Sequence, residues 1–345
     1  MIILSISDVT VTIAVLKPTP ILGGFGKPLI LGSSAAGKDF KNYSDIAAVL
    51  VDYATTTEEY KAAAATFAQK NPPAEIAIVS RRTGTTPEAL VDILPKLFLK
   101  DWHFLISTST LVTDITTIGD AIEADKSRQY FFRTSVQADL TAILVKKYTR
   151  TYGFYHIAAE VAKYPEAAWV GAVGSLPVGS VTWKGWTLVG IAPLDITATE
   201  LAAIHALGAN TYVTKSGTDV TSDGKAVSGD FIDLIHSQDF VVFSVQYAVQ
   251  DLFNQAQAAL SKIPYDNRGI AQIESAVRTV LQRAYLQGMI AVDEDGVPLF
   301  NTTFPPRSQM DAAQIAARNY PDGQFDFVPA GAVHTAAIRG TIKFA

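Results

Sequence analysis

The sequence of 345 residues is long enough for two domains, or for one large α/β domain with an appendage. Only 18% of the residues are charged and the mean hydropathy is +0.20, which indicates apolar surface that other subunits cover. The absence of cysteine excludes disulfides and cysteine-based catalytic or metal sites, and a net charge of -5 without a basic stripe argues against nucleic-acid binding. We expect neither a membrane span nor a signal peptide, because no apolar run reaches about 18 residues and Met1–Leu16 lacks a basic start.

The two ends of the chain show the two-residue period of β-strands. The alternating apolar residues are Val9, Val11, Ile13 and Val15 near the start and Ile338, Ile342 and Phe344 near the other end. A terminal strand needs a neighbouring strand for its backbone groups. It can be an edge strand of the chain's own sheet, which is the simpler interpretation, or it can be donated to another subunit.

Between residues 26 and 160 the pattern predicts alternating strands and helices. The predicted buried strands are Pro28–Leu31, Glu75–Ser80, His103–Ser107, Tyr130–Thr134 and Gly153–Ile157. The predicted helices between them are Thr57–Gln69, Pro87–Leu99, Leu111–Ala124 and Val136–Tyr148. This alternation predicts a mainly parallel sheet that is covered on both faces.

A loop rich in glycine, proline and serine, Gly171–Gly185, is the best candidate for a domain boundary. After it we predict a strand at Thr187–Ile191, a helix at Thr197–Ala206 and a strand at Thr211–Thr214. In residues 229–288, apolar side chains that recur at helical spacing then predict two amphipathic helices. The break Lys262–Gly269 separates them, because a proline and a glycine interrupt the helical pattern there.

One segment, Gly32–Lys38, has the spacing of a phosphate-binding loop and follows a strand. In such loops a serine or threonine follows the lysine and binds magnesium, whereas Asp39 occupies that position here. A surface loop is therefore the favoured interpretation. The alternative is a doubly wound enzyme that binds a nucleotide through Gly32–Lys38.

Other residues with catalytic or metal-binding chemistry are scattered. The histidines are His103, His156, His205, His236 and His334, and they show no metal-type spacing. We interpret His103 and His156 as hydrogen-bonded core residues, because both lie in predicted strands. The acidic segment Asp293–Gly296 is interpreted as a turn, and a calcium site is the less favoured alternative.

Several short sequence segments, taken in their order along the chain, resemble the tail sheath proteins of contractile bacteriophages. They are Gly23–Gly32, Tyr60–Ala63, Phe67–Gln69, Gly179–Lys184, Gly208–Tyr212, Gly229–Asp233, Pro264–Ile270 and Leu286–Gly288. These segments are spread over most of the chain, and their order is more specific than any one segment. The resemblance implies a structural subunit without a catalytic centre or a cofactor.

The resemblance also implies an assembly and its partners. Members of the family stack as hexameric rings around a tail tube, and the sheath contracts to drive the tube through the host envelope during genome ejection. The implied partners are further copies of the chain, the tail tube protein, and the baseplate and tail terminator proteins, with neither nucleic acid nor direct membrane insertion. The implied location is the virion tail, which is assembled in the cytoplasm of the bacterial host.

The fold that this implies is an α/β domain with a mainly parallel sheet, an α+β core domain, and extended β-strand arms at both termini. The predicted boundaries are residues 1–18 for the N-terminal arm, 19–182 for the α/β domain, 183–330 for the sheath core domain and 331–345 for the C-terminal arm. The resemblance favours donation of the two arms between subunits. It makes Arg278 and Arg283 candidate contacts with the tube, although an ordinary solvated helix face explains either residue more simply.

Overall fold

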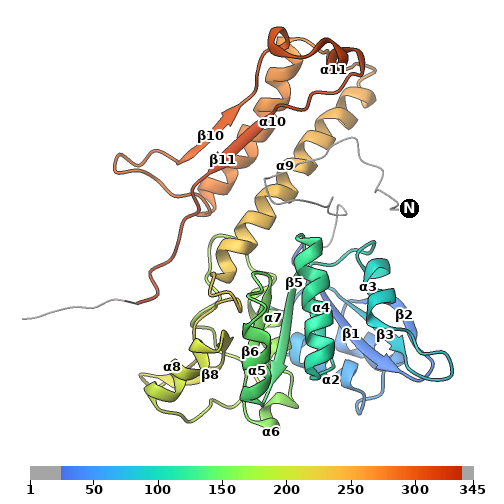
Figure 1. Ribbon diagram of the computed structural model, residues 1–345, viewed down its shortest axis with the longest axis vertical. Coiled ribbons are helices and arrows are strands. Elements are labelled where there is room, and N and C mark those ends of the chain that lie inside the picture. The colour runs from blue at the N-terminus through green and yellow to red at the C-terminus, as the bar shows by residue number, and fades with distance from the viewer. Residues whose placement is uncertain (1–24, 336–345) are drawn as a thin grey trace, which may run out of the picture.

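A computed structural model describes residues 25–335. The alternating residues of the predicted arms, Val9, Val11, Ile13, Val15, Ile338, Ile342 and Phe344, lie outside the described residues. The described chain forms an α/β body, from which a pair of long helices stands out together with a small two-stranded sheet (Figure 1).

A seven-stranded sheet lies at the centre of the α/β body, with the order β2-β3-β1-β4-β5-β6-β7. The strands are β1 (Pro28–Ser34), β2 (Lys38–Tyr43), β3 (Ile76–Arg82), β4 (Phe104–Ser107), β5 (Gln129–Thr134), β6 (Thr151–Tyr155) and β7 (Ala209–Asn210). All pairs are parallel except that of β2 with β3 at one edge. The mainly parallel sheet predicted from the sequence is therefore confirmed.

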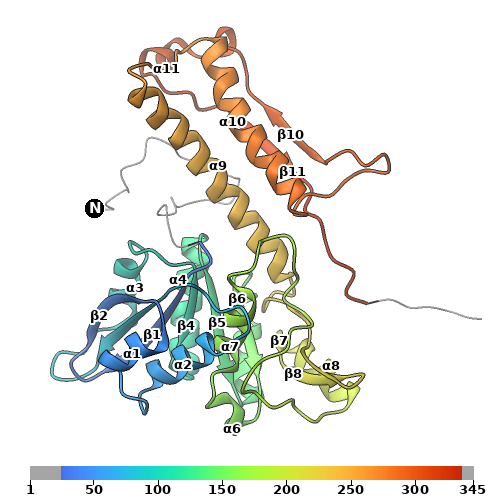
Figure 2. The same ribbon diagram turned by 180° about the vertical axis from the view of Figure 1, so that it is seen from behind.

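Helices cover both faces of this sheet, as buried parallel strands require. One face carries α1 (Ile46–Asp52), α2 (Glu58–Phe67) and α7 (Pro165–Val173), which lie in front of the sheet in Figure 2. The other face carries α3 (Leu90–Leu97), α4 (Val112–Asp125), α5 (Gln137–Leu144) and α8 (Ala198–Ala206). The one-turn helix α6 (Ala158–Val161) follows β6.

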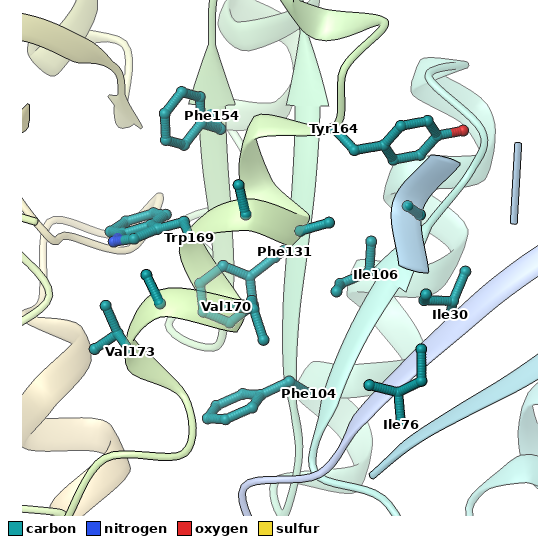
Figure 3. Packing of buried hydrophobic residues seen from close by; sticks show 14 of the residues in the cluster. Ile30, Ile76, Phe104, Ile106, Phe131, Phe154, Tyr164, Trp169, Val170 and Val173 are labelled. Atoms are coloured by element: carbon teal, nitrogen blue, oxygen red, sulfur yellow. The ribbon is translucent and has the colours of Figure 1, made fainter. Parts of the chain in front are cut away.

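Aromatic side chains fill the space between the sheet and α7 (Figure 3). The ring of Trp169 lies 5.7 Å from that of Phe131 and 5.6 Å from that of Phe154, both edge to face. The ring of Trp183, from the loop after α7, stacks 5.0 Å from that of Phe131. Residues on both sides of the predicted domain boundary, between residues 182 and 183, thus belong to one hydrophobic cluster. The division into two domains remains a prediction.

Two of the differences between the structure and the predicted elements have a clear physical cause. The predicted strand Thr187–Ile191 is irregular, because its backbone groups bond to side chains: the amide of Leu188 donates to the Tyr212 hydroxyl (3.0 Å) and that of Val189 to the Gln69 amide oxygen (2.9 Å). Strand β2, with mostly exposed side chains, has no apolar pattern and was not predicted. The predicted strand Thr211–Thr214 is present as β8 (Tyr212–Lys215), which pairs with β9 (Thr218–Thr221).

The two helices predicted from the sequence are present, and they lie antiparallel in the projecting part of the molecule (Figure 1). They are α9 (Ile232–Ala258) and α10 (Asn267–Leu286), and the Asp266 carboxylate caps α10 by accepting from the Gly269 amide at 2.9 Å. Strands β10 (Phe300–Thr303) and β11 (Gln324–Phe327) pair beside α10, and a short 3-10 turn (Arg307–Gln309) and α11 (Ala312–Ala316) connect them. Within residues 25–335, no helix combines the length and apolar character that crossing a bilayer requires.

Candidate functional site

The Gly32–Lys38 segment does not have the geometry of a phosphate-binding loop. Its first residues belong to β1, and Lys38 begins strand β2, whereas a phosphate-binding loop leads into a helix whose amides face the anion. A Cβ atom on Gly32 would lie 2.1 Å from the buried Glu59 carboxylate, so acidic oxygen already occupies the space beside this strand. The Lys38 ammonium donates to the Asp52 carbonyl and lies 4.2 Å from the centre of the Tyr53 ring.

A buried polar cluster joins α9 to the sheet at the amino ends of three strands. The Asp239 carboxylate accepts two hydrogen bonds from the Arg150 guanidinium (2.7 and 2.8 Å) and one from the Gln129 amide (2.8 Å). His103 Nε2 lies 3.4 Å from the same carboxylate. We call these four residues the Asp239 cluster; they come from α9 and from the chain at the start of β4, β5 and β6. The cluster ties the root of the projecting helix to the centre of the body.

The electrostatics of this cluster follow from its burial. Burial alone would raise the pKa of Asp239, but the Arg150 charge and the hydrogen bond to His103 outweigh it and hold this pKa below its usual range. Burial lowers the pKa of His103, and burial together with the neighbouring His103 lowers the pKa of His236 to about 3. The ring of Phe25 stacks on both histidines, at 4.3 Å and 5.1 Å between centres. Both imidazoles are therefore neutral packing residues near pH 7.

The interpretation of His103 and His156 as hydrogen-bonded core residues is confirmed. His156 is buried and its Nε2 lies 2.9 Å from the Ala192 carbonyl oxygen. Among residues 25–335, no three histidine, aspartate or glutamate side chains come together in a way that would hold a metal ion.

A shallow groove runs along the outer face of α10 beside β10, and it contains both arginines predicted as tube contacts. Its helical residues recur every three or four positions and so share one face: Ala271, Glu274, Ser275, Arg278, Thr279, Gln282, Arg283 and Leu286, with Phe300 from β10. We call this surface the α10 groove. It combines two exposed cations with the Leu286 side chain, which is 75% exposed.

The two arginines of the α10 groove have different surroundings. The Arg278 guanidinium donates to the Thr302 hydroxyl on β10 (3.0 Å), which in turn donates to Glu274 (2.7 Å). It also lies 4.0 Å from Glu274, which offsets part of its charge. Arg283 is exposed one turn further along the helix, next to Leu286. Of the two arginines, Arg278 is therefore the one whose charge a neighbouring carboxylate partly offsets.

Strands β10 and β11 form a two-stranded sheet, in which each strand pairs only with the other within the part of the chain that the structure describes. Phe325 and Phe327 pack toward α10 while Gln324 and Asp326 are exposed. Each strand has a second edge whose amides and carbonyls a further strand can pair with. We did not predict these strands, although the polar and apolar alternation of Gln324–Phe327 is a strand signal.

Neither a protein-family model nor a curated protein matches the sequence. Solved structures do match over nearly the whole chain. A chain in the cryo-EM structure of the anti-feeding prophage (AFP) baseplate, 6-fold symmetrised, is 11% identical and aligns over 99% of this chain and 100% of its own, with a TM-score of 0.69.

Two sheath tail proteins also match. Lin1278 from Listeria innocua aligns over 81% of this chain and 89% of its own (9% identity, TM-score 0.56), and DSY3957 from Desulfitobacterium hafniense over 86% and 93% (10% identity, TM-score 0.51). At these identities the likeness establishes the fold. The chain therefore shares its fold with tail sheath proteins and with a chain in the structure of the AFP baseplate, which confirms the resemblance seen in the sequence.

Proposed function

We propose that this protein is a structural subunit of a contractile tail sheath. It assembles as stacked hexameric rings around a tail tube, and contraction drives the tube through a host envelope during genome ejection. The observations that carry the proposal are the matches to two sheath tail proteins over 81% and 86% of this chain, together with the match over 99% of this chain to an AFP baseplate chain, which includes the projecting α9–α10 part. A doubly wound sheet alone hosts many functions and carries no such argument.

The proposed linkage between subunits is strand donation onto the β10–β11 sheet. A two-stranded sheet is marginal by itself, and additional strands would complete it. The C-terminal arm would bring Ile338, Ile342 and Phe344, and the N-terminal arm Val9, Val11, Ile13 and Val15. A one-residue slip would turn Arg339 and Lys343 toward the apolar face, so the alternation sets the register. Burial of each large apolar side chain contributes roughly 1.5–3 kcal/mol before ordering costs.

The proposed contact with the tail tube is the α10 groove. Arg283 and Arg278 would face acidic side chains of the tube protein, and Leu286 would contribute apolar area. Exposed ion pairs of this kind are worth about 1 kcal/mol or less each and are screened by salt. Such weak contacts suit a sheath that must slide along its tube while it contracts.

The α/β body would supply the rigid part of the subunit, with the domain division at residues 182 and 183 as a further proposal. The additional partners would be baseplate and tail terminator proteins at the two ends of the sheath. The proposed location is the tail of the particle, assembled in the bacterial cytoplasm. The match to the AFP baseplate supports a tail-like particle as well as a phage.

Electron microscopy of the purified protein, with and without tube protein, tests the proposal. We expect rings or tubular polymers, and a deletion of Ala337–Ala345 should leave a folded, soluble body that no longer polymerises. A small oligomer that binds ATP and magnesium in calorimetry would instead support the nucleotide-binding enzyme. If the shortened chain unfolds, the last strand belongs to its own sheet, and if it still forms normal sheaths, donation at this end is wrong.

A further inference from the structure

The chain that leads toward the C-terminal arm returns from the projecting part to the body. After β11, the amide of Ala330 donates to the Met289 carbonyl at 2.9 Å, and the next three residues are exposed. The segment then meets the body at His334 through residues that lie about 100 to 150 positions earlier in the sequence. A contact over such a separation has to be formed by tertiary structure, because no local turn brings these residues together.

Four residues make this contact, and we call them the His334 clip: Thr182, Lys184, Phe231 and His334. His334 Nε2 lies 2.9 Å from the Thr182 hydroxyl, and the Lys184 ammonium donates to the His334 carbonyl at 2.7 Å. The Phe231 ring meets the imidazole edge to face, with 4.7 Å between centres. The clip therefore holds both the side chain and the backbone of one residue.

The receiving side of the His334 clip is rigidly supported. Thr182 and Lys184 flank Trp183, which is buried in the core of the body, and the Trp186 indole donates to the Thr182 carbonyl at 2.6 Å. Phe231 immediately precedes α9, and the Lys225 ammonium lies 5.0 Å from the centre of its ring. Because these supports belong to the body, the clip attaches the segment to the body and not to the projecting helices.

We infer that the His334 clip is a permanent anchor that sets the root of the C-terminal arm, so that the chain up to Thr335 keeps its place on the body both before and after assembly. This inference rests on the proposed sheath function. With the clip closed, Phe344 stands nine residues beyond the root and reaches at most about 30 Å from it. With the clip open the root falls back to Ala330, and the reach increases to about 50 Å.

A shorter tether concentrates the arm near its receptor. The effective concentration of a flexible tether falls with about the −3/2 power of its length, so opening the clip should lower it about twofold. Each subunit in a lattice would make such a junction, so a small effect at one junction is repeated throughout the assembly. The anchor also limits the receptor edge on the neighbouring subunit to within about 30 Å of Thr335.

Thiol crosslinking tests the anchor, because the natural sequence has no cysteine. In the double variant Thr182→Cys with His334→Cys, dibromobimane joins the two thiols and becomes fluorescent only when both have reacted. The matched control is Thr182→Cys with Val333→Cys, since Val333 is 88% exposed and lies next to the clip. We expect fast crosslinking within one chain in the His334→Cys variant, equally in free subunits and in assembled particles, and slow reaction in the control.

Assembly of the crosslinked protein distinguishes a clip that stays closed from a clip that must open before the subunits assemble. We expect crosslinked subunits to assemble at the wild-type concentration, and the variant Lys184→Ala with His334→Ala, which removes the side-chain contacts of the clip, to need about twice that concentration. Crosslinked subunits that stay unassembled, or assembled particles in which the thiols fail to join, would overturn the anchor. If the wild-type chain itself forms no polymers, the proposed function fails, while crosslinking of free subunits still shows whether the clip holds the chain.

Discussion

The α/β body and the projecting part differ in how completely their strands are buried and paired. In the body, strands such as β4 and β5 are buried along their whole length, and the largest aromatic side chains are fully covered. In the projecting part, β10 and β11 alternate half-buried and exposed residues and leave sheet edges unpaired within the described chain. A subunit that assembles needs both, because a complete core gives a stable shape and an incomplete sheet gives a place to bind.

The Asp239 cluster joins the two parts, and its loss should be among the largest effects. We expect Asp239→Ala to lower the free energy of unfolding by about 3–5 kcal/mol, because it leaves the buried Arg150 without its counter-charge. Urea unfolding measures this loss. Lys96→Ala, which removes an exposed pair with Glu88, is the control and should cost less than about 1 kcal/mol. Equal losses in the two variants would show that the buried Asp239 cluster stabilises the fold no more than an exposed ion pair does.

The pH dependence of stability should report the histidines next to this junction. Below pH 6.5 the unfolded chain binds protons on His103 and His236, whereas burial keeps both rings neutral in the folded chain, so acid favours unfolding. The free energy of unfolding should therefore fall as the pH drops below 6.5, by up to roughly 1.4 kcal/mol per pH unit from His236, whose pKa is about 3, and His103 contributes in the same direction.

His236→Phe provides the control for this pH dependence, because a phenyl ring keeps the stack with Phe25 and cannot take up a proton. Urea unfolding of this variant at several pH values should show a smaller pH dependence than that of the wild-type chain, by up to roughly 1.4 kcal/mol per pH unit. An unchanged slope would mean that His236 is protonated in the folded protein.

A pair of phenylalanine substitutions sharpens the comparison of the two parts. Phe131→Ala, in the fully buried strand β5, should cost about 3–5 kcal/mol of stability. Phe325→Ala, on the half-buried β11, should cost roughly 1–2 kcal/mol and yet raise the protein concentration needed for polymers in electron microscopy. If Phe325→Ala assembles like the wild type, β10–β11 is not the receptor for the arms.

The smallest effect should come from the α10 groove. Arg283→Glu should weaken assembly on tubes by about 1 kcal/mol and leave the thermal unfolding temperature unchanged, and Arg278→Glu should do less, because Glu274 and Thr302 already engage Arg278. Co-sedimentation with tubes at low and high salt measures both. Tube binding that is unchanged in both variants would remove this groove as the contact.

The sequence predicted the features that depend on local pattern. Continuous apolar runs predicted the parallel strands, and the three- to four-residue spacing before and after Pro264 predicted α9 and α10. Asp39 in place of the serine or threonine of a phosphate-binding loop favoured a surface loop at Gly32–Lys38, and this segment runs from β1 into β2. These predictions succeed because hydrophobic periodicity follows directly from the geometry of helices and strands.

Other features were settled only by tertiary structure. Thr187–Ile191 has the composition of a strand, but the side chains of Gln69 and Tyr212 take its backbone hydrogen bonds. Strand β2 lacks an apolar pattern and exists because the edge of β3 accepts it. Asp239 and Arg150 stand 89 residues apart, and nothing in their local sequence marks them as partners. Sequence patterns report which side chains avoid water, whereas the pairing of distant polar groups depends on which surfaces folding brings together.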